Sequence, residues 1–458
     1  MPQLYPKEVN NSPIGSLELV GVGVSVENWR NHPNYPKFNI WKAIVDSGAA
    51  NIISQDPKQY PDNLGEYRMA SAKRNGDVVD AALRDFMDRY PLPLLVVGSA
   101  WRGEKDGASE EMQRVSNAGS FVGTRDGESH KAPGDFDGLL TQSGQVIDSY
   151  LNDEPDLLWQ TLFATFDENG DLPAMGIAAK DTIVQRAAGD YIKNRPRFDK
   201  KMEDAYRPKH ARIISDNFTV INMVRRGRID WLRPYAPLIG DTMIVKKRGS
   251  MYSRNWSEFS GWKKNPVKPF VPTRYVAKPW TPFQLDQYDH LENLGTLYRP
   301  QVVSYLDDSG HPVKTAERNL RMLTALRAAL APLDGKLPAR ILFDYGSVWN
   351  DRSSSTRFLP LVQGLHAIDE EFDLLDPQHG YDLSRILGDT GAGSSFVGVA
   401  LASMASRQSG GATLVANLRR NDGATLLLVM PPTAEQVKKD AAITRPYFPS
   451  TDNAKVFY

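Results

Sequence analysis

GDTGAGSSFVGVALASMAS, residues 388 to 406, is a glycine-rich turn that opens onto a run of small and apolar residues. The run predicts a helix with Ser394 or Ser395 as its N-cap, because a serine hydroxyl can accept the first free backbone N–H groups of a helix. Helical periodicity places one set of side chains on a buried face: Phe396, Val397, Ala400, Leu401 and Met404. The glycines would let this helix approach its neighbours closely, so the stretch is predicted to be structural.

Three functional templates fail on the same stretch. The phosphate-loop pattern G-x-x-x-x-G-K-[ST] fits residues 388–395 except at its lysine, where Ser394 stands. The dinucleotide-binding pattern requires a glycine in place of Phe396, and the nucleophile elbow G-x-S-x-G requires one in place of Val397. The sequence therefore predicts neither a phosphate site nor a nucleophile here.

Outward from this stretch, strand-like and helix-like segments alternate, which predicts an α/β protein. SLELVGVGVSV, residues 16–26, is rich in valine and leucine and predicts a buried strand. Residues 77–90 have helical periodicity and precede a predicted strand at 92–99, and residues 318–333 and 339–347 repeat that order. With 458 residues and 41% hydrophobic content, the chain can form two domains of ordinary size.

The two halves share a few letters. ALR at 82–84 and GSAW at 98–101 match ALR at 325–327 and GSVW at 346–349. The likeness is consistent with two α/β units related by a distant internal duplication, although helix–strand units also reuse Ala, Leu and Gly for ordinary packing. The expected division is an extension at 1–15, an α/β unit at 16–244, a basic Trp/Pro-rich connector at 245–285, a second α/β unit at 286–440 and a tail at 441–458.

A hairpin is predicted near the end of the second unit. ATLVANLRR and ATLLLVMPP flank Asn421-Asp422-Gly423, residues that supply the positive backbone angles of a tight turn, and Pro431-Pro432 ends the second strand.

The connector has an unusual composition. Residues 245–280 hold nine Lys or Arg and one Glu, which gives a local charge of 9 − 1 = +8, with seven aromatic residues interleaved. The segment can be a linker that packs its aromatic rings and leaves its lysine stems in water, a surface for an acidic protein, or a contact for single-stranded nucleic acid.

Composition excludes several classes of site. Lys plus Arg and Asp plus Glu both number 55, so no overall field attracts nucleic acid or an anionic membrane. The absence of cysteine removes disulfides, thiolate metal sites and cysteine nucleophiles. The N-terminal residues 1–19 have no apolar core and predict neither a signal peptide nor a membrane span, although a chain trimmed of an upstream anchor would look the same.

No catalytic residue, cofactor or metal ligand is predicted. The seven histidines form no H-x-x-x-H pair, and FDENGDL at 166–172 departs from the calcium-loop pattern at its sixth and twelfth positions, which favours a polar turn. IDEEFDLLD at 368–376 carries five carboxylates and is more typical of a solvated face than of acid–base chemistry. Ser99 and Ser347 each follow a strand through a glycine, but no base can be assigned to either.

Four segments resemble the bacterial type VI secretion lipase-adaptor family: LELVGVGVSVENWRN (17–31), LPLLVVGSAWRGE (92–104), GTLYRPQVVSYLDDSGHPVK (295–314) and ARILFDYGSVWND (339–351). The resemblance spans about residues 16 to 432 and carries no site residues across. It implies a non-enzymatic, cytoplasmic adaptor that binds a phospholipase toxin and helps load it on the VgrG spike, without nucleic acid and without membrane insertion. Some relatives begin with a membrane-spanning segment that this chain lacks.

The resemblance makes the connector the first candidate for a contact surface, because Trp, Tyr and Arg most often anchor interfaces. The candidate protein-binding residues are Arg254, Trp256, Trp262, Lys263 and Lys264 in the connector, with Trp101 and Trp349 in the loops after the paired strands.

Two alternatives belong to other classes. A hydrolase could assemble a noncontiguous Ser, His and Asp site by folding. A thiolase-like arrangement also fits a duplicated α/β chain, but without cysteine it lacks the usual nucleophile, which leaves a catalytically dead binding protein.

Overall fold

β1 (Ser16–Val26) is the strand on which the architecture is centred. It pairs antiparallel with β8 (Asn217–Val224) on one side and with β11 (Gly295–Tyr298) on the other. Its predicted bounds are confirmed, and nearly every residue is buried, as its valine and leucine content requires. The computed structural model describes residues 13–54, 59–60, 64–83, 94–98, 128–131, 137–140, 146–151, 158–182, 215–235, 238–239, 263–264, 270, 280, 285, 288–346 and 354–442.

The strand order repeats in the two halves of the sheet. In the N-terminal α/β unit, called the N-unit below, the order is β6 (Val146–Leu151), β3 (Leu94–Gly98), β7 (Ala174–Asp181), β8 and β1. In the C-terminal α/β unit, called the C-unit below, the order is β14 (Gly380–Asp382), β13 (Arg340–Asp344), β15 (Thr413–Asn417), β16 (Gly423–Met430) and β11. Counted along the chain, both units have the order 3-2-4-5-1, with strand 2 parallel to strands 3 and 4 and the other pairs antiparallel. This repetition confirms the α/β class and the duplicated plan.

The GS pair that suggested the duplication does not occupy equivalent places, however. β3 ends at Gly98, whereas β13 ends at Asp344, two residues before Gly346. The topology repeats, but the GS match lies at different positions relative to the two strands.

Further strands extend this sheet. β5 (Asp137–Leu140) and β4 (Glu128–Lys131) continue the N-unit beyond β6, β2 (Trp29–Arg30) pairs with β1, and β12 (Gln301–Ser304) pairs with β16. The boundaries between the two units remain predictions.

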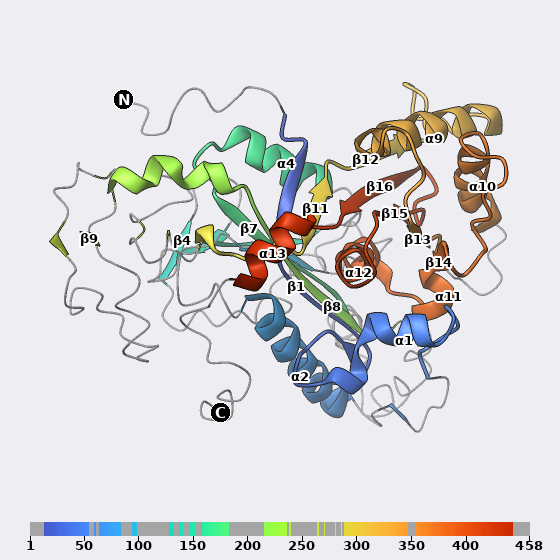
Figure 1. Ribbon diagram of the computed structural model, residues 1–458. Helices are drawn as coiled ribbons and strands as arrows, with labels where there is room; N and C mark the ends of the chain where they lie inside the picture. Colours follow the sequence, from blue (N-terminus) through green and yellow to red (C-terminus); the bar gives the residue numbers. More distant parts are fainter. Residues whose placement is uncertain are drawn as a thin grey trace, which may run out of the picture.

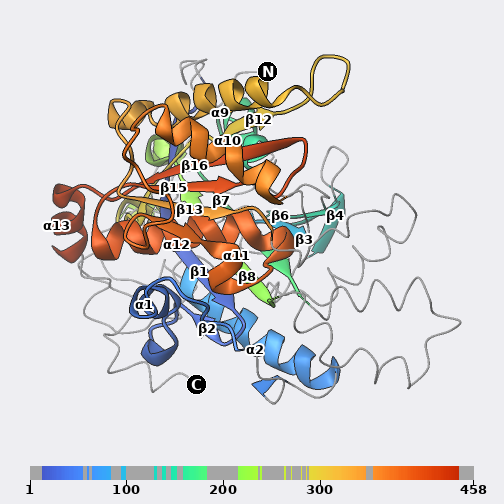
Figure 2. The same ribbon diagram turned by 90° about the vertical axis from the view of Figure 1, so that its right-hand side faces the viewer.

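Helices form an inner layer and two outer layers. α2 (Leu64–Leu83) packs on the outer face of β1 and β8, and α9 (Thr315–Ala329) and α10 (Ser354–His366) lie against the outer face of the C-unit. Figures 1 and 2 place α2 and the α9–α10 pair at opposite ends of the molecule, with α12 (Ser394–Ser409) between them. The other α-helices among the described residues are α1 (Ile40–Asp46), α4 (Leu158–Glu168), α11 (Leu383–Leu387) and α13 (Ala434–Ala442).

Two predicted helices differ in extent. The helix expected at 77–90 begins at Leu64, and its expected end lies outside the described residues. The helix expected at 318–333 is α9, which starts at Thr315 and is followed by a short 3-10 turn at Ala331–Leu333.

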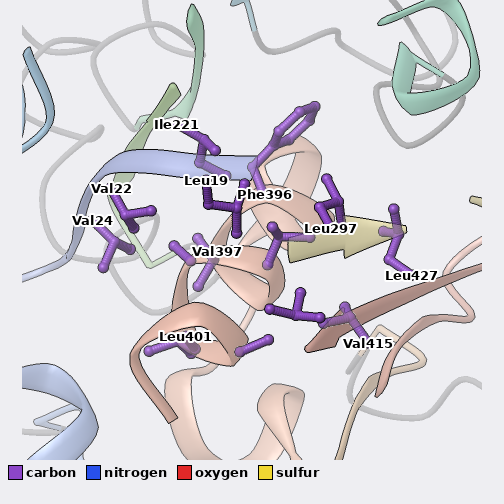
Figure 3. Packing of buried hydrophobic residues seen from close by; sticks show 14 of the residues in the cluster. Leu19, Val22, Val24, Ile221, Leu297, Phe396, Val397, Leu401, Val415 and Leu427 are labelled. Carbon is purple, nitrogen blue, oxygen red and sulfur yellow. The ribbon is translucent and has the colours of Figure 1, made fainter. Parts of the chain in front are cut away.

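α12 is buried on every side, not on one face as the sequence suggested. All residues from Ser394 to Ser406 are buried, because the helix lies between side chains of both units. Figure 3 shows Phe396, Val397 and Leu401 among Leu19 and Ile221 of the N-unit and Leu297, Val415 and Leu427 of the C-unit. A helix without a polar face needs such complete enclosure.

The predicted N-cap is wrong by one position. Gly393 is the N-cap and supplies no side-chain bond, while Ser394 and Ser395 are the first helical residues. Their hydroxyls serve tertiary contacts instead: Ser394 donates to Asp344, and Ser395 accepts from the Trp159 indole of α4 at 3.1 Å.

The predicted hairpin forms between β15 and β16, and Pro431 follows its last residue, Met430, as expected. Its connection is five residues, 418–422, and none of Asn421, Asp422 and Gly423 has a positive φ, so the tight-turn prediction is wrong. Gly423 serves close approach instead, because a Cβ there would lie 2.2 Å from the carbonyl oxygen of Val303.

Candidate functional site

The N-terminal turn of α12 lies where several strands end. β13 and β15 are parallel and end at Asp344 and Asn417, and β7 of the other unit ends at Asp181. Each of these three residues is hydrogen-bonded to residues 392–394 directly or through one neighbour. The turn from the quoted sequence therefore sits at a junction between the units, lined by polar side chains.

Asp344 is the centre of this junction and is only 2% exposed. Its carboxylate accepts hydrogen bonds from Ser384 Oγ at 2.7 Å, Ser394 Oγ at 2.5 Å and the Gly346 N–H at 2.7 Å. Burial by itself would raise the pKa of Asp344, but the charge of Arg419 and these hydrogen bonds outweigh it and hold the pKa below its usual value. Asp344 is therefore a buried anion.

Arg419 neutralises that anion and joins it to the quoted stretch. Its guanidinium lies 3.2 Å from Asp344 Oδ2 and 2.5 Å from Asp389 Oδ1. Burial alone would lower the pKa of Arg419, yet the two carboxylates raise it, so the guanidinium remains charged. Removing one partner of such a buried pair leaves an uncompensated buried charge and is strongly destabilising.

The N-unit contacts the same turn from the opposite side. Asp181 accepts from the Ala392 N–H at 2.9 Å, and the Asn217 amide donates to the Thr390 carbonyl at 2.9 Å. At Gly393 a Cβ would lie 1.8 Å from Asn217 Oδ1, so only glycine allows this approach. The expectation that the glycines permit close packing is confirmed at Gly393.

A second buried cluster lies where the hairpin between β1 and β2 meets α2. Glu27 has a φ of 49°, accepts from the Asp216 N–H at 2.7 Å and is 6% exposed, and Asp216 pairs with Arg74 of α2 at 3.0 Å. Burial, and then the charge of Asp216, raises the pKa of Glu27 to about 8. Arg74 thus forms its ion pair with Asp216, and Glu27 lies beside this pair with a raised pKa.

The chemistry of the central junction favours a structural role. Ser394 is buried, and its hydroxyl donates to a carboxylate whose lowered pKa makes it a weak base. No histidine of the described part is hydrogen-bonded to Ser394, so an acyl-transfer arrangement lacks its proton acceptor there. Ser99 and Ser347 lie outside the described residues.

The other sequence candidates make local polar contacts: the calcium-like stretch starts in the last turn of α4, which ends at Glu168, and only its remainder forms the expected turn. Asp167 of the calcium-like stretch accepts from the Ile14 N–H and pairs with Arg299 at 2.6 Å. Within 368–376, Asp369, Asp373 and Asp376 each cap the backbone N–H two residues on and lie in a largely exposed turn. No group of three or more potential metal ligands occurs among the described residues.

Two of the seven predicted protein-binding residues lie within the described part of the chain. Lys263 and Lys264 form β10 (Lys263–Lys264), which pairs with β9 (Leu238–Ile239). The other five lie outside the described residues: Arg254, Trp256, Trp262, Trp101 and Trp349.

Two connector aromatics pack against the N-unit. Trp280 is fully buried, and the Phe270 ring is stacked with Trp231 at a centroid distance of 6.4 Å. Phe270 and Trp280 of the connector therefore contribute to the hydrophobic packing of the N-unit.

Sequence reasoning missed Asp344, Arg419 and the Glu27 cluster. Asp344 was visible as the polar residue that ends the predicted strand ARILFD, a position where side chains of parallel strands gather. No local signal marks Arg419 or Glu27, whose partners lie up to 189 residues away in the chain.

The fold and the junction define a duplicated α/β protein in which the strand ends around the central helix are linked by the chain's own ion pairs and serines. Residues 15–200 match the family described as "Type VI lipase adapter protein Tla3, N-terminal", and residues 294–431 match "Type VI lipase adapter protein Tla3, C-terminal". The chain belongs to this type VI lipase adapter family. The resemblance expected from the sequence is confirmed.

Solved structures with a similar arrangement are distant in sequence. The ishigamide ketosynthase/chain length factor is 11% identical with a TM-score of 0.46 over 92% of this chain and 100% of that one. The AntDE:AntF complex of a ketosynthase and its acyl-carrier protein is 10% identical with a TM-score of 0.42. Acetamide-bound Xanthomonas campestris OleA is 8% identical with a TM-score of 0.39, and both have the same coverages as the first structure. Within the described residues, no helix has the length and apolar character to cross a membrane.

Proposed function

We propose that this chain is a non-enzymatic adaptor that binds a phospholipase toxin of the type VI secretion system and helps load it on the VgrG spike. The observation that carries the proposal is family membership at both ends of the chain, over residues 15–200 and 294–431. The proposed site of action is the cytoplasm, where toxin and spike would meet before export.

The geometry of the junction supports binding over catalysis. The strand ends that a small-molecule site would use are occupied by Asp344, Arg419 and Asp181, each already paired within the chain. An adaptor acts through its outer surface, which needs no activated nucleophile.

The proposed contact surface is the basic aromatic segment with Arg254, Trp256, Trp262, Lys263 and Lys264, assisted by Trp101 and Trp349. Its support is compositional: aromatic and arginine side chains anchor interfaces, and a local charge of +8 complements an acidic partner.

The test is a binding measurement with purified components. The chain is mixed with a type VI lipase toxin and with VgrG from its own source, and complexes are measured by light scattering and titration. The variant with Trp256, Trp262, Lys263 and Lys264 all changed to Ala should bind the toxin at least tenfold more weakly.

A matched control changes an exposed apolar residue and an exposed lysine elsewhere, Leu320→Ala with Lys336→Ala, and should bind as the parent does. Failure of the parent chain to bind either protein, together with ester hydrolysis by the purified chain, would contradict the adaptor and favour the hydrolase. Binding to single-stranded nucleic acid that weakens steeply with salt would instead indicate the nucleic-acid alternative.

A further inference from the structure

Lys180 is a buried lysine in an unusual position. It is the next-to-last residue of β7, faces Phe218 of β8 and is 7% exposed. Strand alternation places it on the same face as Ala174 and Ala178, which belong to the apolar cluster that includes Val78 and Ala82 of α2. A lysine is almost never so deeply buried unless it is paired.

The duplicated fold offers an internal comparison. The β7–β8 and β15–β16 ladders both end in an inward pair of polar residues, Asp181 with Asn217 and Asn417 with Thr425. The next pair faces outward and is Lys180 with Phe218 in the N-unit but Ala416 with Leu426 in the C-unit. The C-unit thus has two apolar side chains at the position equivalent to Lys180 and Phe218, so the fold itself does not require an amine there.

Nothing in the described part of the chain compensates the charge. The Lys180 side chain makes no ion pair or hydrogen bond with any described residue, and the nearby Asp181 carboxylate is turned to the Ala392 N–H on the other face of the sheet. Because burial in apolar surroundings disfavours the ammonium form, it lowers the pKa of Lys180 to about 8. An appreciable share of the amine is therefore neutral, and hence nucleophilic, near physiological pH.

We propose that Lys180 is a modification site of this protein, an amine that small activated acyl compounds such as acyl phosphates and thioesters convert to an amide. With acetyl phosphate, the neutral Nζ attacks the carbonyl carbon, the C–O bond to phosphate breaks with its electron pair leaving on phosphate, and the proton lost from nitrogen passes to water. The product is neutral, so acylation removes the cost of a buried charge. Because the whole donor must reach Nζ, the limited exposure selects small donors such as acetyl phosphate over bulky thioesters.

The experiment exposes the folded chain to acetyl phosphate from pH 6.5 to 10 and follows acetylation of each lysine by peptide mass spectrometry. Lys37 and Lys336, which are exposed and make no ion pair with the described residues, are internal references. At pH 7 the neutral fraction of an amine of pKa about 8 exceeds that of an ordinary lysine by roughly 250-fold. After allowance for lower basicity and restricted access, we expect Lys180 to react at least fivefold faster than the references at pH 7 and its rate to level off above about pH 8.

The same reaction in 8 M urea, where burial is removed, should bring Lys180 to the rate of the references. The variant Lys180→Met should lose the modified peptide and leave the reference rates unchanged. A Lys180 that stays unmodified in the folded chain, or whose rate rises in parallel with Lys37 up to pH 10, would overturn the proposal.

Discussion

Glu27→Gln should make the protein more stable at alkaline pH. The pKa of Glu27 is raised from 4.5 to about 8, so the folded chain holds a proton there that the unfolded chain has already released. A raised folded-state pKa gives stability that is complete below about pH 4.5 and is lost as the pH rises through about 8. Glutamine keeps the size and the acceptor for the Asp216 N–H but has no proton to lose.

The magnitude follows from those two pKa values. Between pH 5 and pH 8 the wild-type free energy of unfolding should fall by roughly 3 to 4 kcal/mol relative to that of Glu27→Gln, because each pH unit in this range changes it by at most about 1.4 kcal/mol. The side chain is buried, so salt should change this difference little. The cause is desolvation reinforced by Asp216, which Arg74 only partly offsets.

Urea unfolding followed by tryptophan fluorescence at pH 5, 6, 7 and 8 measures the effect. Glu371→Gln, at an exposed position in the 368–376 turn, is the matched control and should give a curve parallel to wild type. A constant difference between wild type and Glu27→Gln across this pH range would refute the assignment of a raised pKa to Glu27.

Two further predictions concern the junction at α12. Gly393→Ala should lower the free energy of unfolding by more than about 3 kcal/mol, because its Cβ would overlap Asn217. The control Gly227→Ala, whose Cβ meets nothing closer than 4.0 Å, should change it by less than about 1 kcal/mol. Thermal unfolding of both variants measures the difference. Asp344→Asn leaves Arg419 with only one carboxylate and should cost about 3 to 5 kcal/mol in urea unfolding. A loss below about 1 kcal/mol would show that Asp344 is not the anchor of the junction.

Several elements of this fold could be predicted from the sequence. The strand at 16–26 was predicted to the residue, and the strands at 94–98 and 340–344 lie within their predicted ranges. These predictions succeed because valine and leucine content and helical periodicity are local properties, fixed by the pleat of a strand and the pitch of a helix. The family could likewise be inferred from short segments.

Features that depend on contacts with residues distant in the sequence could not be predicted from the sequence. The connection after β15 was predicted as a tight turn, but Gly423 is needed for its contact with Val303, which lies 120 residues earlier. One-sided burial was predicted for α12, since periodicity cannot reveal a second layer packed on the other face.

The sequence by itself determined the α/β class, the lack of cysteine chemistry and the bounds of the strand at 16–26. Only the tertiary structure decided that the strand order repeats, that Asp344 meets Arg419 and Ser394, and that Glu27 and Lys180 are buried with shifted pKa values. The physical reason is that desolvation and charge pairing depend on which distant segments surround a group, and a one-dimensional pattern does not contain that information.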